Sequence, residues 1–408
     1  MKKIVVTGMG AATPVGIGVE NYWNNITAGA SGIDTIKTFD PSELAVQIAG
    51  EVKDFNPSDY LPKDLIRKTD PFMQYAYIAA EEAMKQSGIK IEPERTGIVM
   101  GTAMAGIATI AYTQEALTGA SHKKVGPRFI PKILGNIAAA NIAIDYNIQG
   151  PSFTVSTACS SGGDAINTAC MCMQSGKADI MLAVGAESVL CPLVIYSLAN
   201  AKALSRRNDS PSTASRPFDV TRDGFVIGEG GGALVLETEE HALARGAKIY
   251  AEIRGCGNTD DAYHVTAPHP EGRGAIACMK QAIAEAGINP SDIGYINAHG
   301  TATNKGDTVE TSSIKKVFGN TLPYVSSTKG ATGHMMGAGG ITETITCVKA
   351  IETGTVPPTI NLNEVDPECA GIDFVANTAK KAEINFAMSN AFGFGGQNSS
   401  IIVGKYGK

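Results

Sequence analysis

The sequence predicts an α/β fold in which helices cover a mostly parallel central sheet. Two observations lead to this prediction. Short runs of β-branched and apolar residues alternate with longer stretches in which small apolar residues recur at helical spacing. The order of a strand, an alanine-rich helix and a strand ending in glycine also occurs twice along the chain. We therefore expect two similar halves, residues 1–248 and 249–408, that face each other at a midline.

Six short apolar runs read as buried strands: residues 4–7, 97–100, 152–157, 180–184, 296–298 and 325–327. Residues 69–87 and 273–286 read as helices, because apolar side chains recur at helical spacing and a glycine follows each segment. The glycine-rich run 225–235 is typical of a bent hairpin strand. Gly8 and Gly10 follow the first strand and partly match a dinucleotide fingerprint, but a strand-to-loop turn is the favoured interpretation.

Composition excludes several classes of protein. Of 408 residues, 43% are hydrophobic and 18% charged, which is globular and argues against a disordered or fibrous chain. The net charge of −6 argues against broad nucleic-acid binding. No apolar run reaches the roughly 18 residues of a membrane span, and the N-terminal run is too short for a signal peptide. The eight scattered cysteines indicate reduced thiols, so we expect a cytoplasmic protein.

Cys159 lies where a strand turns sharply into a helix. The run STACSSG follows a β-type segment, and apolar residues at helical spacing follow it until Gly176. A thiol at a helix N-terminus is near free N–H groups, which favour the thiolate. From this pattern alone, a nucleophile and a buried structural cysteine are equally good interpretations.

His299 and His334 each follow an apolar strand and are flanked by glycine and threonine. The carboxyl ends of strands are where α/β sheets place their sites, so both are candidate catalytic residues. They lie 140 and 175 positions beyond Cys159, so only the fold can bring the three together. A zinc site is an alternative, but the paired short spacing of most zinc sites is missing, and we expect no metal.

The segment NAFGFGG places glycine on both sides of Phe394 after another apolar run. Such a backbone bends sharply and exposes N–H groups, which suits an oxyanion hole or a mobile gate. A plain hairpin turn is the alternative interpretation.

Together these segments resemble the β-ketoacyl-[acyl carrier protein] synthases, the elongating ketosynthases of the thiolase-like superfamily. The similarity extends over nearly the whole chain and includes VTGMGAATPVG, STACSSG, NAHGTAT, STKGATGH and SNAFGFGG. It implies a thiolase-like fold of two duplicated βαβαβ halves in five αβαβα layers. The implied activity is a decarboxylative Claisen condensation in fatty acid biosynthesis, which joins malonyl-acyl carrier protein to an acyl group on Cys159. A type II polyketide or aryl-polyene ketosynthase with the same chemistry is the alternative, and a noncatalytic chain-length subunit is disfavoured because Cys159 is intact.

The resemblance also implies a role for individual residues. Cys159, His299, His334 and Lys329 are the implied catalytic residues, and the N–H groups of Cys159 and Phe394 the implied oxyanion hole. Substrate contacts are implied for Met104, Leu198, Thr301, Thr303 and Phe394, and supporting roles for Asp307, Glu310 and Glu343, the last paired with Lys329. Leu198 stands where many relatives carry phenylalanine, so the pocket depth is open.

Partners follow from the same resemblance. The substrate arrives on the phosphopantetheine of acyl carrier protein, and no cofactor is expected. The family has a structural monovalent cation beside the positions of Asn297, Glu343, Ser389 and Asn390. A homodimer is expected, with a heterodimer with a chain-length-factor-like subunit as the alternative. Basic residues match the positions that dock the acidic carrier protein: Arg67, Lys68, Lys123, Lys124 and Lys202.

Overall fold

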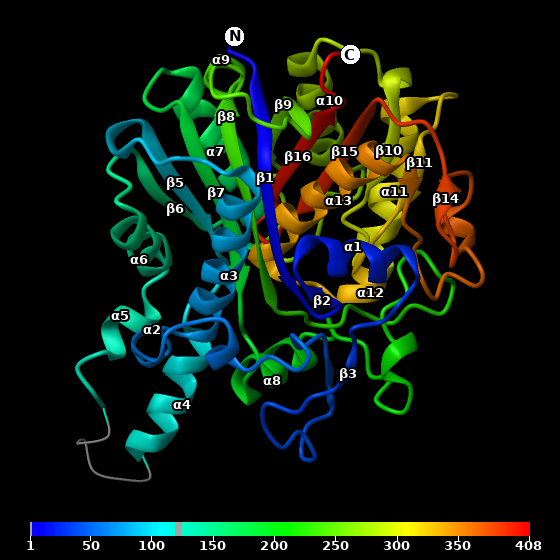
Figure 1. Ribbon diagram of the computed structural model, residues 1–408. Helices are drawn as coiled ribbons and strands as arrows, with labels where there is room; N and C mark the ends of the chain where they lie inside the picture. The colour runs from blue at the N-terminus through cyan, green and yellow to red at the C-terminus, as the bar shows by residue number, and fades with distance from the viewer. Residues whose placement is uncertain (1, 119–124) are drawn as a thin grey trace.

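A computed structural model describes residues 2–118 and 125–408. Its main feature is a twelve-stranded sheet with the order β13-β11-β10-β15-β16-β9-β1-β8-β7-β5-β6, with β2 attached to β1. In Figure 1 the strands of the first half lie on one side of β1 and those of the second half on the other. The strands of this sheet are β1 (Ile4–Thr13), β2 (Gly16–Ile17), β5 (Thr96–Gly101), β6 (Ser152–Val155), β7 (Ile180–Glu187), β8 (Gly230–Thr238), β9 (Ala251–Asp260), β10 (Ile293–Asn297), β11 (Tyr324–Ser326), β13 (Asp373–Phe374), β15 (Phe386–Phe392) and β16 (Gln397–Gly404).

Two small sheets and a set of helices complete the fold. The small sheets pair β3 (Asp34–Thr35) with β4 (Ile48–Ala49), and β12 (Thr355–Val356) with β14 (Lys380–Lys381). The α-helices are α1 (Val19–Thr27), α2 (Lys63–Lys68), α3 (Pro71–Ser87), α4 (Ile107–Thr118), α5 (Phe129–Ile133), α6 (Asn136–Tyr146), α7 (Ser161–Gln174), α8 (Pro192–Asn200), α9 (Glu239–Ala244), α10 (Arg273–Ala286), α11 (Asn304–Phe318), α12 (Lys329–Thr332) and α13 (Gly339–Thr353). Among the described residues, no helix combines the length and the apolar character needed to cross a membrane.

The strand pairing repeats between the two halves. In the first half β1 is antiparallel to β8, β8 is antiparallel to β7, and β5 is parallel to both β7 and β6. In the second half β9, β16, β15, β10 and β11 show the same series of relations. The two series meet where Ile4–Val6 of β1 pair with β9. The topology therefore contains a duplication, while the division at residue 248 stays a prediction.

The strands β1, β8, β7, β5 and β6 form one wing of the sheet, and β9, β16, β15, β10 and β11 form the other. Helices form three layers around these two wings. Helix α3 packs on β1, β7 and β8, and α10 packs on β9 and β16. Helices α7 and α13 contact each other and pack on strands of both wings. Their apolar side chains share one buried cluster that includes Ile166, Ile341 and Ile345. The order is thus helix, sheet, helix, sheet, helix, as the predicted thiolase-like fold requires.

Three predictions about strands were wrong. The large sheet is mixed, because its inner strands β1, β8, β9 and β16 are antiparallel to their neighbours and only the outer strands are parallel. The run 225–235 forms no hairpin, since β8 pairs with the distant β1 and β7. Gly8 and Gly10 form no turn, because β1 continues through them. A Cβ on Gly10 would lie 1.9 Å from the Ala79 carbonyl oxygen, so glycine lets α3 pack closely on this strand.

Candidate active site

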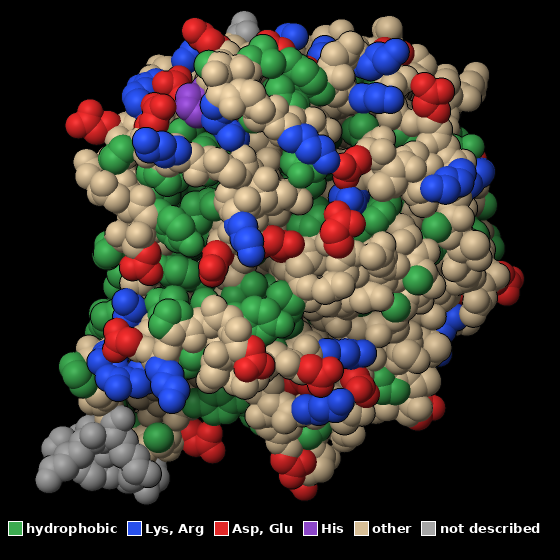
Figure 2. All heavy atoms as spheres, in the orientation of Figure 1, with side chains coloured by type: hydrophobic (Ala, Val, Ile, Leu, Met, Phe, Trp, Pro, Cys, Tyr) green, Lys and Arg blue, Asp and Glu red, His purple; other side chains and the backbone are tan. Residues whose placement is uncertain are grey.

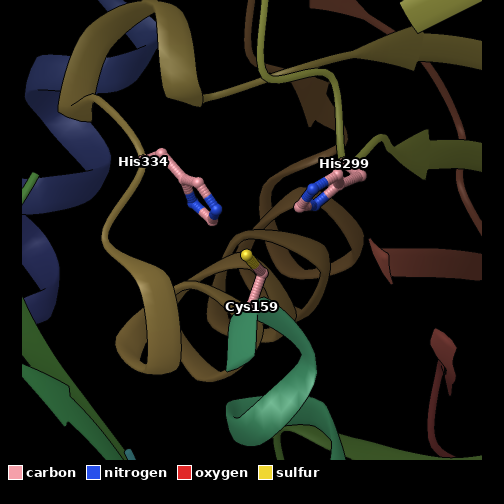
Figure 3. A group of neighbouring side chains, drawn as sticks. All are labelled: Cys159, His299 and His334. Carbon is pink, nitrogen blue, oxygen red and sulfur yellow. The ribbon is translucent and has the colours of Figure 1, made fainter. Parts of the chain in front are cut away.

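The fold brings Cys159, His299 and His334 together. The cysteine sulfur and one nitrogen of each imidazole all lie within 4.8 Å of one another. Figure 3 shows both rings pointing toward the sulfur from the side opposite the helix that carries it. The cysteine comes from the first half and both histidines from the second, so the site lies where the halves meet.

A strained turn presents Cys159. The residue lies in a 3₁₀ turn (Ala158–Ser160) between β6 and α7. Ala158 has a φ of 50°, a conformation that residues other than glycine rarely adopt. Hydrogen bonds hold the turn: the Thr157 amide donates to Ser161 Oγ at 2.9 Å, and the Thr157 hydroxyl donates to Asp164 at 2.5 Å. The turn thus orients the thiol toward the cavity and away from the helix.

The thiol of Cys159 is protonated at neutral pH. Burial raises its pKa to about 11, while a hydrogen bond from the Phe394 backbone and the charge of Lys329 act in the opposite direction. The expectation that the helix N-terminus favours the thiolate is therefore wrong for the free site, because loss of hydration outweighs the nearby N–H groups. The Phe394 backbone therefore lies near the sulfur, and its role in an oxyanion hole stays a prediction.

Both histidines are neutral and have unused nitrogens. Burial and the charge of Lys329 hold the pKa of each imidazole well below its usual range. Nδ1 of His299 and both ring nitrogens of His334 find no hydrogen-bond partner among the described residues. The rings lie edge to face with centroids 5.3 Å apart. A neutral imidazole carries one N–H donor and one acceptor nitrogen, so each ring can donate to a ligand in the cavity.

Backbone contacts fix the two histidines. Glu310 on α11 accepts hydrogen bonds from the amides of His299 and Gly300, both at 2.8 Å. The His334 amide donates to the Val226 carbonyl at 2.7 Å, and the Gly228 amide donates to the His334 carbonyl at 2.9 Å. Burial raises the pKa of Glu310 to about 7. The supporting position predicted for Glu310 is therefore next to His299.

Lys329 and Glu343 form a buried ion pair, as the family resemblance implies. Both side chains are almost fully removed from solvent, and the charge of Lys329 influences the pKa of Cys159, His299 and His334. The second oxygen of Glu343 and Oδ1 of Asn297 are buried without a hydrogen-bond partner among the described residues. These oxygens fit the donor set of a monovalent cation.

Asp307 lies behind the loop that carries the two threonines. It accepts hydrogen bonds from the amides of Phe218 at 2.8 Å and Ala302 at 3.2 Å. The guanidinium of Arg222 lies 3.5 Å away. Burial raises the pKa of Asp307 to about 6. Asp307 therefore contacts the backbone of residues 301–303 and not the side chains of Cys159, His299 or His334.

A cavity of about 500 Å³ contains the three reacting side chains. Every predicted substrate contact lines it: Met104, Leu198, Thr301, Thr303 and Phe394. Its walls differ in chemistry. Thr301, Thr303, Asn304 and Lys305 are polar lining residues from one segment. Ala103, Leu198 and Met336 belong to one apolar cluster, Met104 follows Ala103, and we call these four lining residues the apolar wall.

The predicted docking residues are spread over the surface. Lys202 is exposed and lines the cavity, whereas Arg67 and Lys68 on α2 lie outside its lining. Figure 2 shows Lys and Arg side chains near α2 and α5, with acidic side chains close to them. Lys123 and Lys124 lie outside the described residues.

Sequence reasoning missed several residues of the site. Phe225 and Phe392 each pack an aromatic ring against a catalytic imidazole, with centroids 5.5 and 5.9 Å away. Asp261 lines the cavity and accepts from Asn398 at 3.0 Å. Glu187, at the end of β7, is fully buried beneath the apolar wall. The signal for Glu187 was available, since it ends a continuous apolar strand.

Fold and site together define a condensing enzyme of the thiolase-like type. Models of the β-ketoacyl synthase N-terminal and C-terminal domains match residues 1–242 and 250–363. The chain therefore belongs to the β-ketoacyl synthase family. It is similar to 3-oxoacyl-[acyl-carrier-protein] synthase 2 of Coxiella burnetii, with 44% identity over 409 residues and 99% of each chain covered.

Solved structures agree with this assignment. The ishigamide ketosynthase/chain length factor superposes with a TM-score of 0.93 at 34% identity, covering all of both chains. A type II PKS ketosynthase in complex with its acyl-carrier protein gives a TM-score of 0.90 at 32% identity, with 99% of each chain covered. These matches confirm the predicted family and fold.

Proposed function

We propose that the protein is a β-ketoacyl-acyl carrier protein synthase that elongates acyl chains by two carbons in fatty acid biosynthesis. The observation that carries the proposal is the convergence of one thiol and two neutral imidazoles in a cavity with an apolar wall. This set of groups suits acyl transfer to sulfur followed by a carbon–carbon condensation.

The first step transfers an acyl group from carrier-protein phosphopantetheine to Cys159. The sulfur attacks the thioester carbonyl, its proton passes to a neutral imidazole, and the pantetheine thiolate leaves and takes up a proton. The amides of Cys159 and Phe394 stabilise the negative oxygen of the tetrahedral intermediate. One thioester replaces another, so the step needs no external energy source.

The second step forms the nucleophile and the new bond. The N–H groups of His299 and His334 donate to the thioester carbonyl of malonyl-carrier protein. The carboxylate leaves as CO2, and its bonding electrons form an enolate whose oxygen these donors stabilise. The enolate carbon attacks the Cys159 thioester, the thiolate leaves, and a β-ketoacyl thioester two carbons longer remains on the carrier protein. Loss of CO2 makes the condensation effectively irreversible.

The remaining predicted residues fit this sequence of steps. Burial keeps both imidazoles neutral, the positive charge of Lys329 acts in the same direction, and Glu343 pairs with Lys329. Thr301 and Thr303 offer hydroxyls to the pantetheine arm, while Met104 and Leu198 contact the acyl chain. Asp307 and Glu310 orient the loop that carries His299. A cation bound by Asn297 and Glu343 would add positive charge behind Lys329, and we propose no other cofactor.

We propose that the carrier protein docks at the mouth of the cavity, with Lys202 among its contacts. Lys202 is exposed and lines the mouth, and its charge complements an acidic partner. The similar type II PKS ketosynthase in complex with its acyl-carrier protein supports this type of partner. Arg67 and Lys68 on α2 are proposed as further contacts, while the predicted contacts of Lys123 and Lys124 lie outside the described residues.

We also propose a homodimer formed along the edge strand β6. Phe153 on this strand is 47% exposed and Ile144 on α6 is 75% exposed, so a large apolar area lacks cover in one chain. Figure 2 shows hydrophobic side chains gathered over the side where α6 lies. A heterodimer with a chain-length-factor-like subunit is the second candidate, as the similar ishigamide ketosynthase/chain length factor indicates.

A type II polyketide or aryl-polyene ketosynthase remains the alternative function, because the similar structures include the ishigamide ketosynthase/chain length factor and a type II PKS ketosynthase. The chemistry at Cys159 would be the same and the acyl chains would differ. Mass spectrometry of carrier-bound products over a series of primers decides between them. Saturated products that lengthen from any short primer support fatty acid synthesis, whereas products confined to polyketide or polyene intermediates support the alternative.

Cys159→Ala tests the proposed function directly. The variant lacks the acyl acceptor but keeps both imidazoles, so it should lose condensation and still release CO2 from malonyl-carrier protein. His334→Ala should lose decarboxylation while Cys159 still accepts an acyl group, as intact-protein mass spectrometry would report. Normal β-ketoacyl formation by Cys159→Ala would refute the proposal.

A further inference from the structure

Glu187 is a buried carboxylate with four hydrogen-bond donors and no ion pair among the described residues. Its side chain is fully removed from solvent. It accepts from Thr102 Oγ1 at 3.0 Å and from the amides of Ala103 at 2.6 Å, Met104 at 3.1 Å and Gly337 at 3.1 Å. A buried charge without a counterion is unfavourable unless its hydrogen bonds define a structure that the protein needs.

These donors belong to two turns from different halves of the chain. Thr102–Met104 follow β5, and Gly337 lies in the 3₁₀ turn (Met336–Ala338) that follows His334. Each turn contains a residue in a strained conformation, because Ala105 has a φ of 48° and Met336 a φ of 45°. Turns of this kind need an external anchor.

Glu187 provides that anchor for both. Oε1 accepts from Thr102 and Met104, which belong to one turn. Oε2 accepts from Ala103 and Gly337, one residue from each turn, and so links the two turns directly. The fit is tight: a Cβ on Gly337 would lie 2.9 Å from the carboxylate. One carboxylate therefore sets the distance between the two turns.

Both turns line the apolar wall of the cavity. Ala103 and Met104 come from one turn and Met336 from the other, whereas the threonines of the polar wall lie elsewhere. The acyl chain of the proposed reaction would pass between these side chains. The spacing of the two turns would then limit the space available to the acyl chain.

We propose that Glu187 is a positioning residue that determines acyl chain-length specificity by fixing the Met104 and Met336 turns. The proposal rests on the proposed function. Glu187 touches neither substrate nor the reacting atoms, and its effect should fall on long chains, which reach the wall, and spare short ones.

Glu187→Gln is the first test. The amide keeps the size of the side chain but replaces one acceptor oxygen with a donor. If it replaces Oε2, the amides of Ala103 and Gly337 lose their acceptor, and if it replaces Oε1, the amide of Met104 does, so the link between the turns weakens in either orientation. Acylation of Cys159 is measured by intact-protein mass spectrometry with acyl-carrier protein substrates of increasing length. We expect the ratio of kcat/KM between the best primer and a primer four carbons longer to fall about tenfold. Decarboxylation of malonyl-carrier protein should change by less than roughly threefold.

Glu237→Gln is the matched control. Glu237 is equally buried and is paired in register with the opposite end of β7, where it accepts from Arg245, His241 and Thr7. Its variant should keep the wild-type chain-length profile. If Glu187→Gln does not fold, Thr102→Val removes one donor of the same network and should shift the profile in the same direction.

Two results would overturn the proposal. Glu187 also raises the pKa of Cys159 by its charge, so a uniform rise in acylation for all chain lengths would assign it an electrostatic role. An unchanged chain-length ratio in a folded Glu187→Gln protein would remove the positioning role. Failure of the proposed function would appear separately, as the absence of acylation and decarboxylation in the unmodified protein.

Discussion

At the scale of single residues, the site depends on charges that are kept away from water. Burial lowers the pKa of both catalytic imidazoles, and the positive charge of the Lys329–Glu343 pair lowers it further. Neutral imidazoles donate hydrogen bonds without attracting the malonyl carboxylate, which has to leave as CO2. The protein thus separates the group that supplies positive potential from the groups that contact the substrate.

The neutral histidines predict a flat pH profile. Decarboxylation by Cys159→Ala should stay constant from about pH 8 to about pH 6.5, the ordinary pKa of histidine, because both folded-state values lie well below it. As the pH falls, these histidines bind protons in the unfolded chain at a higher pH than in the folded protein. Their contribution to stability is therefore present above about pH 6.5 and is lost as the pH falls below it. Initial rates of CO2 release across this range provide the measurement. A loss of rate centred near pH 6.5 would contradict neutral imidazoles.

Lys329→Met should destabilise the fold as well as the site. Removing one partner leaves Glu343 charged and unpaired in the interior, which costs about 3–5 kcal/mol of unfolding free energy. Denaturant unfolding of Lys329→Met, Glu343→Gln and the double variant gives the coupling energy. The double variant should be less destabilised than the sum of the single changes, and strict additivity would show that the pair is not coupled.

At the scale of elements, the first turns of α7 and α13 meet through glycines. A Cβ on Gly340 would lie 2.3 Å from the Gly163 amide nitrogen, and one on Gly162 would lie 2.8 Å from the Gly337 carbonyl oxygen. This close approach brings the turn of Cys159 next to the turn that follows His334. Gly340→Ala should therefore lower the unfolding free energy by roughly 1–3 kcal/mol and slow condensation.

Gly126→Ala is the control for that change. A Cβ there meets nothing within 4 Å among the residues that the structure describes, so the variant should behave like the unmodified protein. Thermal unfolding and condensation rates of both variants provide the measurement. Normal stability and rate in Gly340→Ala would mean that the two helices can separate without affecting the site.

Much of the site could be predicted from short segments, because each reacting residue follows a strand and is flanked by small residues. The turn at Cys159 and the positions of His299 and His334 are properties of a few neighbours along the chain. Contacts between distant segments determine three other features: the direction of strands β1 and β8, the path of β1 through Gly8, and the burial of Glu187. The thiol pKa was missed for the same reason, since burial is set by the whole fold.

At the scale of the whole molecule, surface charge should control access of the carrier protein. Lys202→Glu should raise the KM for carrier-bound substrate several-fold with little change in kcat, because the lysine lines the mouth and contacts no reacting group. The effect should weaken as salt increases. Lys405→Glu, an exposed lysine outside the cavity lining, is the control. Equal KM values for both variants at low salt would exclude Lys202 from docking.

The dimer prediction belongs to this scale too. Phe153→Asp adds a charge to the apolar edge strand and should shift the protein toward monomers in sedimentation experiments. Leu243→Asp, at another exposed apolar position on α9, should leave the assembly unchanged. A Phe153→Asp protein that sediments like the unmodified one would place the dimer contact elsewhere.

The two duplicated halves contribute different groups to the reaction, since the sulfur belongs to one half and both imidazoles belong to the other. Two polypeptides produced by cutting the gene in the loop between α9 and β9 would each be chemically inert. Turnover would return only when the fragments reassociate in their original orientation, so the rate of product formation would report how well the two pieces fit together.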